Sequence, residues 1–344
     1  MKIGIIGASG YGGLELIRLL HEHPEVGQID LFTSSEEGTI FSNKYPHLTD
    51  LYDQPLNEID FDRLVTYDVI FASTPAGVTS KLFPPLLDRG PTLIDLSGDF
   101  RLKDLSDYEA WYKKAPAPIE AIEKSAYGLT EWNAKSIREA QLIANPGCYP
   151  TAALLSILPL LKERQIDVSH LVIDAKSGVS GAGNALSPMT HFSETNENLS
   201  IYKIHQHQHI PEIEQAMEIF GGMKSPITFT THLTPMTRGI MTTTYAMLVD
   251  GITEVDLICN LRETYQHMPF VRVIEDIAKF GTKQVYGSNY CDLHVKVDER
   301  TNRATIVSVI DNLVKGAAGQ AVQNMNVRFN FDEKAGLEQV PLFI

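Results

Sequence analysis

The chain has 344 residues, 43% of them hydrophobic and 21% charged, which is the ordinary composition of a folded globular protein of about two domains. Its formal net charge of −14 disfavours non-specific binding to nucleic acid, because such binding needs a basic surface. We expect a cytoplasmic protein in a reducing compartment, since the three cysteines are widely spaced, no apolar run has membrane-spanning length, and the first residues resemble a strand rather than a signal peptide.

The first part of the chain alternates short apolar strands with helical segments. A glycine-rich turn at 7–13 follows the first strand, and the next helix begins there with an apolar face. The predicted buried strands are, in chain order, 2–6, 28–32, 68–73, 92–96 and 141–145. This alternation predicts a doubly wound, Rossmann-type α/β domain over residues 1–147.

The pattern changes after residue 147, where the strands become longer and alternate polar with apolar residues. A helix is predicted over 150–163, a second over 253–268, and a hairpin turn at 299–302. The predicted strands are 227–235, 239–249, 291–299 and 303–311. We predict an α+β catalytic and oligomerisation domain over 148–311, with a mainly antiparallel or mixed sheet. Small side chains in the closing helix allow close packing, so 312–344 is assigned to the first domain.

The glycine-rich turn has the context of a dinucleotide-binding site, because it leaves a buried strand and opens a helix. The backbone N–H groups of such a turn approach a pyrophosphate only where no Cβ intervenes. The alternative is a tight turn that binds nothing. The residues predicted to bind the cofactor are Gly7, Ser9, Gly10, Tyr11, Gly12 and Gly13, with Ser73 and Pro75 from the loop after a later strand.

The end of the second strand indicates which dinucleotide binds. NAD-binding domains commonly carry an acidic residue there for the ribose hydroxyl. In this chain the strand is followed by Thr33, Ser34 and Ser35, whose neutral hydroxyls can donate to a 2′-phosphate. We therefore predict NADP, with Ser34 and Ser35 in its site, although Glu36 and Glu37 come next and no arginine follows.

Cys148 lies in the stretch NPGCYPT, just before an apolar helical segment. Pro150 suits the first turn of a helix, and a helix N-terminus favours a thiolate and stabilises an oxyanion. A lone cysteine is more often a small buried hydrophobe, and we keep that interpretation for Cys259 and Cys291, which lie in apolar patterns.

The stretch HQHQHIPEIEQ supplies candidate proton carriers for a thiolate nucleophile. On a strand, His205, His207 and His209 would share one face, but their spacing matches no familiar zinc site. The acid–base interpretation selects His209, which precedes a helix start, with Glu212 or Glu214 to orient it. We expect the other two histidines to be surface or packing residues.

Seven stretches together resemble the N-acetyl-gamma-glutamyl-phosphate reductase family, and the resemblance covers nearly the whole chain. They are residues 7–13 (GASGYGG), 95–102 (DLSGDFRL), 145–151 (NPGCYPT), 177–183 (SGVSGAG), 205–213 (HQHQHIPEI), 232–240 (HLTPMTRGI) and 311–326 (DNLVKGAAGQAVQNMN). The resemblance implies an NADP-dependent acyl-phosphate reductase of arginine biosynthesis. By that resemblance Cys148 is the nucleophile and His209 the acid–base residue.

The resemblance also implies binding residues. Those expected to bind the anionic substrate are Arg101, Arg238, Asn145 and Glu212. Those expected near the nicotinamide are Ser177, Gly178 and Asn312. Two positions depart from the family pattern, because Ser35 and Asn184 stand where the family commonly has arginine, and both bear on phosphate contacts.

The implied reaction is the reduction of N-acetyl-L-glutamyl 5-phosphate to the 5-semialdehyde, with release of phosphate, through a Cys148 thioester. Three alternatives remain open: a sister reductase of aspartyl or aminoadipyl phosphate, an NAD-dependent phosphorylating aldehyde dehydrogenase, and a non-catalytic dinucleotide-binding regulator. We expect a small-molecule acyl-phosphate substrate, no nucleic-acid or membrane partner, no metal, and a homodimer or homotetramer, as the family suggests.

Overall fold

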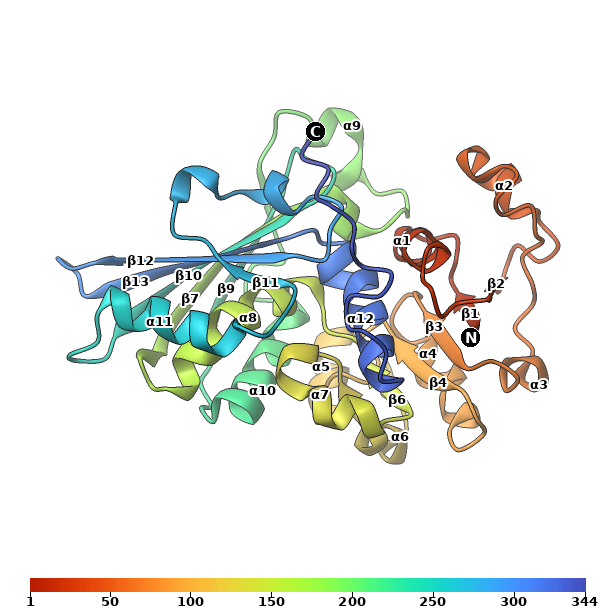
Figure 1. Cartoon of the computed structure of the whole chain (residues 1–344), viewed down its shortest axis with the longest axis horizontal. Coiled ribbons are helices and arrows are strands. Elements are labelled where there is room, and N and C mark those ends of the chain that lie inside the picture. Colours follow the sequence, from red (N-terminus) through yellow and green to blue (C-terminus); the bar gives the residue numbers. More distant parts are fainter. The chain divides into compact units, whose positions relative to one another are not determined.

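A computed structural model describes residues 1–344, and the chain divides into two compact units (Figure 1). The first unit comprises Met1–Glu109, Lys114–Asn145 and Ala321–Gly336, and the second comprises Ala110–Lys113, Pro146–Gln320 and Leu337–Ile344. Residues 312–320 and 337–344 therefore belong to the second unit, whereas the sequence pattern assigned all of 312–344 to the first.

The first unit is built on a six-stranded sheet in which every neighbouring pair is parallel, with the order β2-β1-β3-β4-β6-β5. Its strands are β1 (Lys2–Ile6), β2 (Gln28–Phe32), β3 (Val69–Ala72), β4 (Thr92–Asp95), β5 (Ser125–Tyr127) and β6 (Leu142–Ala144). The chain order reverses at β1, which lies between β2 and β3, so the predicted doubly wound fold is confirmed. The sequence pattern missed β5, because its three residues, Ser-Ala-Tyr, do not form an apolar run like that of the equally short β6.

Helices follow most strands of the first unit. They are α1 (Tyr11–His21), α2 (Phe41–Lys44), α3 (Phe61–Leu64), α4 (Thr79–Leu82), α5 (Leu105–Tyr112), α6 (Ile119–Lys124) and α7 (Thr130–Glu139). The apolar face of α1 is buried through Leu16, Ile17, Leu19 and Leu20. All four residues of β3 are buried, as expected for a parallel strand covered on both faces.

The C-terminal helix is not regular along its whole length. Residues Val314–Ala318 form a single π-helical stretch, and α12 follows at Gly319–Arg328. Within the first unit, Asn324 on α12 donates to the Gly128 carbonyl at 2.8 Å and accepts from the Thr130 hydroxyl at 2.7 Å. A π-helical stretch within a helix often marks a functional site, and Gly316 in this stretch lies against Cys148.

The second unit is built on a seven-stranded sheet with the order β11-β12-β13-β10-β7-β9-β8. Its strands are β7 (Ile166–Gly178), β8 (Ser200–Tyr202), β9 (Thr228–Thr234), β10 (Ile240–Leu248), β11 (Val271–Val273), β12 (Cys291–Asp298) and β13 (Arg303–Ile310). Two pairs, β7 with β9 and β11 with β12, are parallel and the others antiparallel, so the sheet is mixed. The predicted hairpin joins β12 to β13, with Asn302 at a φ of 50°. The pattern missed the long strand β7.

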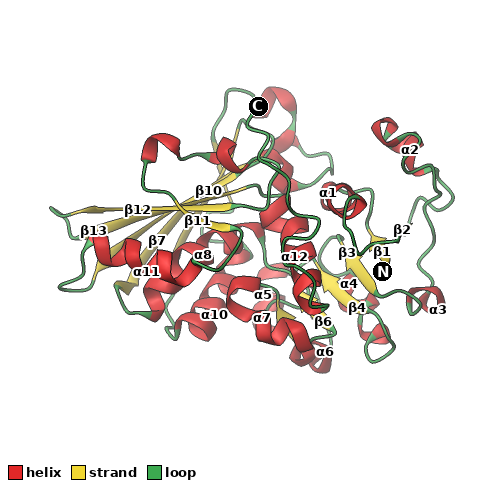
Figure 2. Ribbon diagram, in the orientation of Figure 1, coloured by secondary structure: helices red, strands yellow, loops and turns green.

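Four helices accompany that sheet: α8 (Cys148–Lys162), α9 (Phe192–Thr195), α10 (His209–Gly221) and α11 (Glu254–Tyr265). Figures 1 and 2 show α8, α10 and α11 on one side of it. Helix α8 is buried from Tyr149 to Leu161, as expected for a helix that is hydrophobic on all sides. The helix continues through Pro159. Cys291 is buried as expected, but Cys259 on α11 is exposed, which corrects its predicted place in the core.

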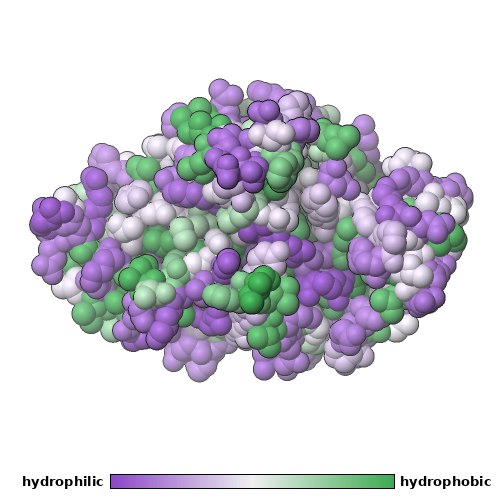
Figure 3. Space-filling view, turned by 90° about the horizontal axis from the view of Figure 1, so that it is seen from above, coloured by the Kyte–Doolittle hydropathy of each residue, from purple (hydrophilic) through white to green (hydrophobic).

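The surface is largely hydrophilic, as expected for a chain with 21% charged residues. Figure 3 shows hydrophilic residues spread over one face of the molecule, with hydrophobic residues in several separate patches. No helix is long and apolar enough to span a membrane.

Candidate active site

The glycine-rich turn leaves no room for side chains. Gly7 has a φ of +78°, and a Cβ added to it would lie 2.3 Å from the Ser73 carbonyl oxygen. A Cβ on Gly13 would lie 2.5 Å from the Gly7 carbonyl oxygen. Gly10 is the N-cap of α1 and has no side-chain cap, so the first N–H groups of this helix are not satisfied by a cap. These features fit a dinucleotide pyrophosphate bound at the helix start.

The loops beside this turn carry the other residues predicted to bind the cofactor. Ser73 follows β3 and donates its backbone N–H to the Ile6 carbonyl at 2.9 Å, which places it directly beside the turn. Pro75, two residues on, is exposed. Ser34 and Ser35 follow β2 and are also exposed. Their contacts with a cofactor stay predictions.

The loop after β3 is held by a buried pair of carboxylates, Asp95 and Asp99, which the sequence reasoning did not single out. Asp99 accepts from the backbone N–H groups of Gly77 (2.7 Å) and Ser80 (2.9 Å). The Thr79 hydroxyl oxygen lies 2.9 Å from one oxygen of each carboxylate. Burial raises the pKa of Asp95, and the neighbouring Asp99 charge adds to that rise. The motif DLSGDF thus shapes the loop that carries Ser73 and Pro75.

Arg101 ends that motif and is buried, with 5% of its surface exposed. Its Nε donates to the Asn145 carbonyl at 2.7 Å and its Nη2 to the Leu96 carbonyl at 3.0 Å. Asn145 is also buried, and its side-chain oxygen accepts from Asn324 at 3.0 Å. The structure therefore shows both residues supporting the strand end that leads to Cys148. Their predicted contact with substrate stays a prediction.

Cys148 is the first residue of α8, and Gly147 is the N-cap without a side-chain cap. The thiol is partly exposed, and a Cβ on Gly316 of the π-helical stretch would lie 2.8 Å from the Cys148 Cβ. The Gly147 carbonyl accepts from the backbone N–H and the hydroxyl of Thr151, both at 2.9 Å. Cys148 thus lies at a fixed helix N-terminus, where the helix dipole favours a thiolate.

His209 is the first residue of α10, and its ring lies against the turn that carries Cys148. A Cβ on Gly147 would be 2.4 Å from the His209 Nε2, so glycine is required there. Glu212, in the first turn of the same helix, is fully buried and accepts the Gly147 N–H at 2.8 Å. Glu214 instead accepts from Ile227 N–H at 2.9 Å. Of the two carboxylates considered as orienting groups, Glu212 is the one near the nucleophile.

The three alternating histidines do not lie on a strand, which corrects that expectation. His205 adopts a left-handed φ of 54° and is exposed, whereas His207 is buried and precedes α10. The His207 Nδ1 accepts the backbone N–H of His209 at 3.2 Å, and the two ring centroids are 4.6 Å apart. Burial, aided by the Lys203 charge, lowers the pKa of His207 to about 3, so its ring is neutral.

His207 also belongs to an aromatic cluster behind the nucleophile. Its ring contacts Tyr149 edge-on at 5.4 Å between centroids, and Phe229 at 5.7 Å. The Tyr149 hydroxyl lies 2.9 Å from the Tyr202 hydroxyl, and burial raises the pKa of Tyr149. His207 is thus a buried packing residue, as expected. Nothing in the sequence predicted that its ring would pack against that of His209.

The residues predicted near the nicotinamide lie at the end of β7 and just after β13. Asn312 accepts the Gly239 N–H at 2.8 Å and donates to the Ser180 hydroxyl at 3.0 Å. A Cβ on Gly178 would lie 2.7 Å from the Thr237 carbonyl oxygen, and Ser177 is buried beside it. Asn312 therefore joins two loops of the second unit.

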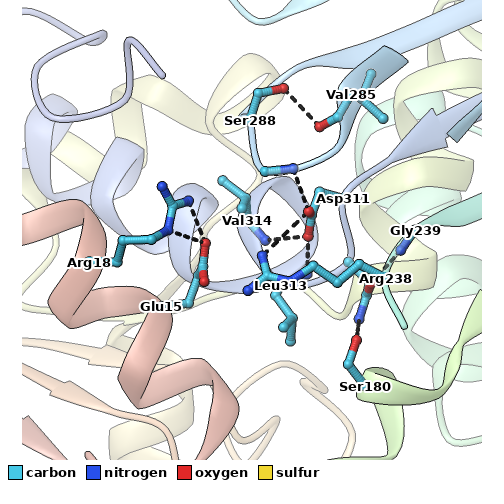
Figure 4. A network of polar contacts seen from close by, with 12 residues as sticks. Glu15, Arg18, Ser180, Arg238, Gly239, Val285, Ser288, Asp311, Leu313 and Val314 are labelled. Carbon is cyan, nitrogen blue, oxygen red and sulfur yellow. Dashed lines mark hydrogen bonds and ion pairs between the residues drawn. The ribbon is translucent and has the colours of Figure 1, made fainter. Parts of the chain in front are cut away.

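Asp311 fixes the start of the C-terminal segment and orients Arg238 (Figure 4). Its buried carboxylate accepts from Gly287 N–H at 2.7 Å and Leu313 N–H at 2.9 Å. The Arg238 Nη1 lies 3.5 Å from the same carboxylate, and the arginine side chain is 21% exposed. Arg238 is thus a partly accessible cation next to Asn312, in agreement with an anion-binding role that stays a prediction.

The fold and these sites define an oxidoreductase of the semialdehyde dehydrogenase class. Residues 2–140 match the family model "Semialdehyde dehydrogenase, NAD binding domain" and residues 148–312 match "Semialdehyde dehydrogenase, dimerisation domain". A solved aspartate semialdehyde dehydrogenase II from Vibrio cholerae superposes with a TM-score of 0.71 at 16% identity, over 96% of this chain and 98% of that one. The NADP-bound enzyme from Candida albicans gives 0.71 at 14% identity, over 97% and 98%.

Curated relatives narrow the class. Proteins named N-acetyl-gamma-glutamyl-phosphate reductase from Geobacillus kaustophilus and Bacillus subtilis are each 52% identical over 344 residues, and one from Geobacillus sp. WCH70 is 53% identical, with all of each chain covered. The chain belongs to the N-acetyl-gamma-glutamyl-phosphate reductase family. The resemblance drawn from its motifs is thereby confirmed, and the reading as a non-catalytic regulator is set aside.

Proposed function

We infer that the chain catalyses the NADPH-dependent reduction of N-acetyl-L-glutamyl 5-phosphate to N-acetyl-L-glutamate 5-semialdehyde, with release of phosphate, in the cytoplasmic synthesis of arginine. The shared name of its relatives supports the substrate. One structural observation carries the chemistry: Cys148 begins α8, and the His209 ring lies against the preceding glycine at the start of α10.

The cofactor has its own binding residues in the first unit. The turn from Gly7 to Gly13 would hold the pyrophosphate, since a Cβ at either end would clash with backbone. NADPH, when bound, supplies the hydride that reduces the acyl carbon. The Asp99 carboxylate holds the N–H groups of Gly77 and Ser80, which keeps the loop beside the pyrophosphate in place.

The first half of the reaction forms a thioester on Cys148. The Cys148 Sγ attacks the acyl carbon while His209 takes the thiol proton. Backbone N–H groups at the uncapped start of α8 can bind the oxyanion, an interaction worth about 3 kcal/mol per donor in other enzymes. The C–O bond to phosphate then breaks, and the leaving phosphate takes both electrons of that bond. Arg238, partly exposed beside Asn312, is the side chain we assign to the anionic substrate.

The second half returns the enzyme to its starting state. Once the thioester carbon is reduced, the resulting alkoxide collapses to the aldehyde and expels the Cys148 thiolate. Protonated His209 then gives its proton back to that sulfur. Glu212 supports both halves, because it accepts the Gly147 N–H and so holds the turn against which the His209 ring lies.

The match to a dimerisation domain over residues 148–312 supports assigning oligomer formation to this unit. We propose a homodimer or homotetramer. The face of the large sheet opposite its helices carries Val172 and Tyr245, each 38% exposed, and suits a second copy. Light scattering on a sizing column measures the state directly.

The reverse reaction tests the proposal. Enzyme, N-acetylglutamate semialdehyde, phosphate and NADP should give phosphate-dependent NADPH absorbance, and Cys148→Ser should lower the rate by at least about 10³-fold, because the oxygen nucleophile makes a poorer acyl carrier and leaving group. A wild-type enzyme that binds NADP but turns over only aspartyl or aminoadipyl semialdehyde would contradict the substrate. Full activity of Cys148→Ser would contradict the mechanism.

A further inference from the structure

An ion pair between Glu36 and Lys44 lies just beyond the end of β2. Glu36 belongs to the turn that leaves this edge strand, and Lys44 is the last residue of α2. The Lys44 ammonium contacts the Glu36 carboxylate, and their side chains are 32% and 33% exposed. The hydrogen bond from Lys44 lowers the pKa of Glu36, so the carboxylate is ionised. Exposed pairs of this kind contribute little to stability, which leaves room for a functional role.

Two contacts attach this pair to the glycine-rich turn. The Tyr45 hydroxyl, next to Lys44, donates to the Ser9 backbone carbonyl at 2.6 Å. The Ser9 side chain hydrogen-bonds to Glu36. Ser9 belongs to the turn that receives the pyrophosphate. The Lys44 ammonium is thus held on the ribose side of the dinucleotide site, since the ribose 2′ position lies at the end of the second strand in this fold.

A 2′-phosphate needs a cation at this place, and the residues directly after β2 offer none. Thr33, Ser34 and Ser35 are neutral, and an unpaired Glu36 would repel a group that carries nearly two negative charges. Arg63, which also lies near the end of β2, is engaged elsewhere. It donates to the Asn57 side-chain oxygen at 2.6 Å and lies 3.5 Å from the Asp30 carboxylate.

We propose that Lys44 binds the 2′-phosphate of NADP while it stays paired with Glu36, and that this pair sets the preference for NADP over NAD. The proposal rests on the NADP dependence inferred above. It also gives a reason for serine at position 35, where the family resemblance leads one to expect arginine: the cation comes from α2 instead. A lysine ammonium serves as a point charge for such a phosphate.

The test compares 2′,5′-ADP with 5′-AMP, two fragments that differ only in the 2′-phosphate, by isothermal titration of the full-length enzyme. Lys44→Met should weaken binding of 2′,5′-ADP at least tenfold and change that of 5′-AMP less than twofold. Glu36→Gln should leave 2′,5′-ADP binding equal or tighter. Lys124→Met, on α6, removes the cation of another exposed ion pair, the one with Asp88, and should change neither affinity. Lys44→Arg should keep the discrimination.

The outcomes separate this proposal from the function on which it rests. If wild-type enzyme prefers 2′,5′-ADP and Lys44→Met keeps that preference, NADP use stands and the role of Lys44 is wrong. If Glu36→Gln weakens 5′-AMP binding, Glu36 is the acceptor for the ribose hydroxyl and the proposal is overturned. If wild-type enzyme does not distinguish the two fragments, the inferred NADP dependence fails as well. Melting temperatures of all variants should match that of wild type.

Discussion

The two units present their functional groups in opposite ways. In the first unit the candidate site consists of backbone, and the turn from Gly7 to Gly13 can take a ligand because side chains are missing there. In the second unit the reacting groups are side chains, and Cys148 and His209 are positioned by the starts of two helices. The first kind of site is damaged by adding one atom. The second is damaged by losing a polar group or moving it.

Gly147 is the exception to this contrast. It is a glycine, but it lies between the two reacting side chains of the second unit, Cys148 and His209. Gly147→Ala would place a Cβ 2.4 Å from the His209 Nε2 and push the base away from the thiol. We expect kcat to fall by about 10²-fold, the usual consequence of misplacing a catalytic group by about 1 Å, with NADPH binding unchanged.

The control for this variant is Gly27→Ala, since a Cβ there would meet nothing nearer than the Met1 carbonyl oxygen at 3.9 Å. Steady-state kinetics and a separate NADPH titration measure the two effects. Normal kcat for Gly147→Ala would show that the imidazole has space to move without losing function, and would contradict the assigned role of His209.

Gly7→Ala addresses the backbone site. The new Cβ would lie 2.3 Å from the Ser73 carbonyl oxygen, and the φ of +78° adds strain of about 1–3 kcal/mol. We expect NADPH affinity to fall more than tenfold. Iodoacetamide alkylation of Cys148 in the absence of cofactor should stay at the wild-type rate, because the thiol belongs to the other unit.

Gly251→Ala in the second unit is the matched control, with a φ of +83° and nothing within 4 Å of its Cβ. It carries the strain of a left-handed residue without the clash. Equal losses of NADPH affinity in Gly7→Ala and Gly251→Ala would assign the effect to backbone strain rather than to the close approach of the backbone at Ser73.

The smallest expected effect is the gradual dependence of folding stability on pH that is caused by the buried His207. Burial lowers its pKa to about 3 in the folded protein, from the ordinary histidine value of 6.5, so between these pH values the unfolded chain binds more protons than the folded one. Stability therefore rises with pH in this window and is lost as pH falls from 6.5 towards 3, by at most about 1.4 kcal/mol per pH unit.

Urea midpoints between pH 4 and 7 measure that slope. Replacing the ring in His207→Gln should flatten it, whereas replacing the exposed His170 with Gln should leave it as in wild type. A slope that His207→Gln does not change would mean that other groups cause the acid sensitivity. The kcat of His207→Gln should also fall, because the acceptor for the His209 backbone N–H is altered.

Local patterns in the sequence were sufficient for five of the six strands of the first unit, for the glycine-rich turn and for the position of Cys148 at a helix start. Each of these depends on residues close together in the chain: an apolar run, a glycine spacing, a proline in a first helical turn. The helix over 254–265 was also predicted, and its capping box at Thr253 is a local feature of the same kind.

Tertiary structure alone decided which polar groups meet. Glu212 accepts a backbone N–H from a residue 65 positions away, and Arg101 donates to a carbonyl 44 positions away. Lys44 pairs with Glu36, which in turn hydrogen-bonds to Ser9. The histidine stretch resembled a strand because its alternation is real, but His205 turns the chain and burial makes His207 neutral. The sequence specifies which polar side chains are present. Their charge state and hydrogen-bond partners depend on burial and distance, and these are fixed only when remote segments pack together.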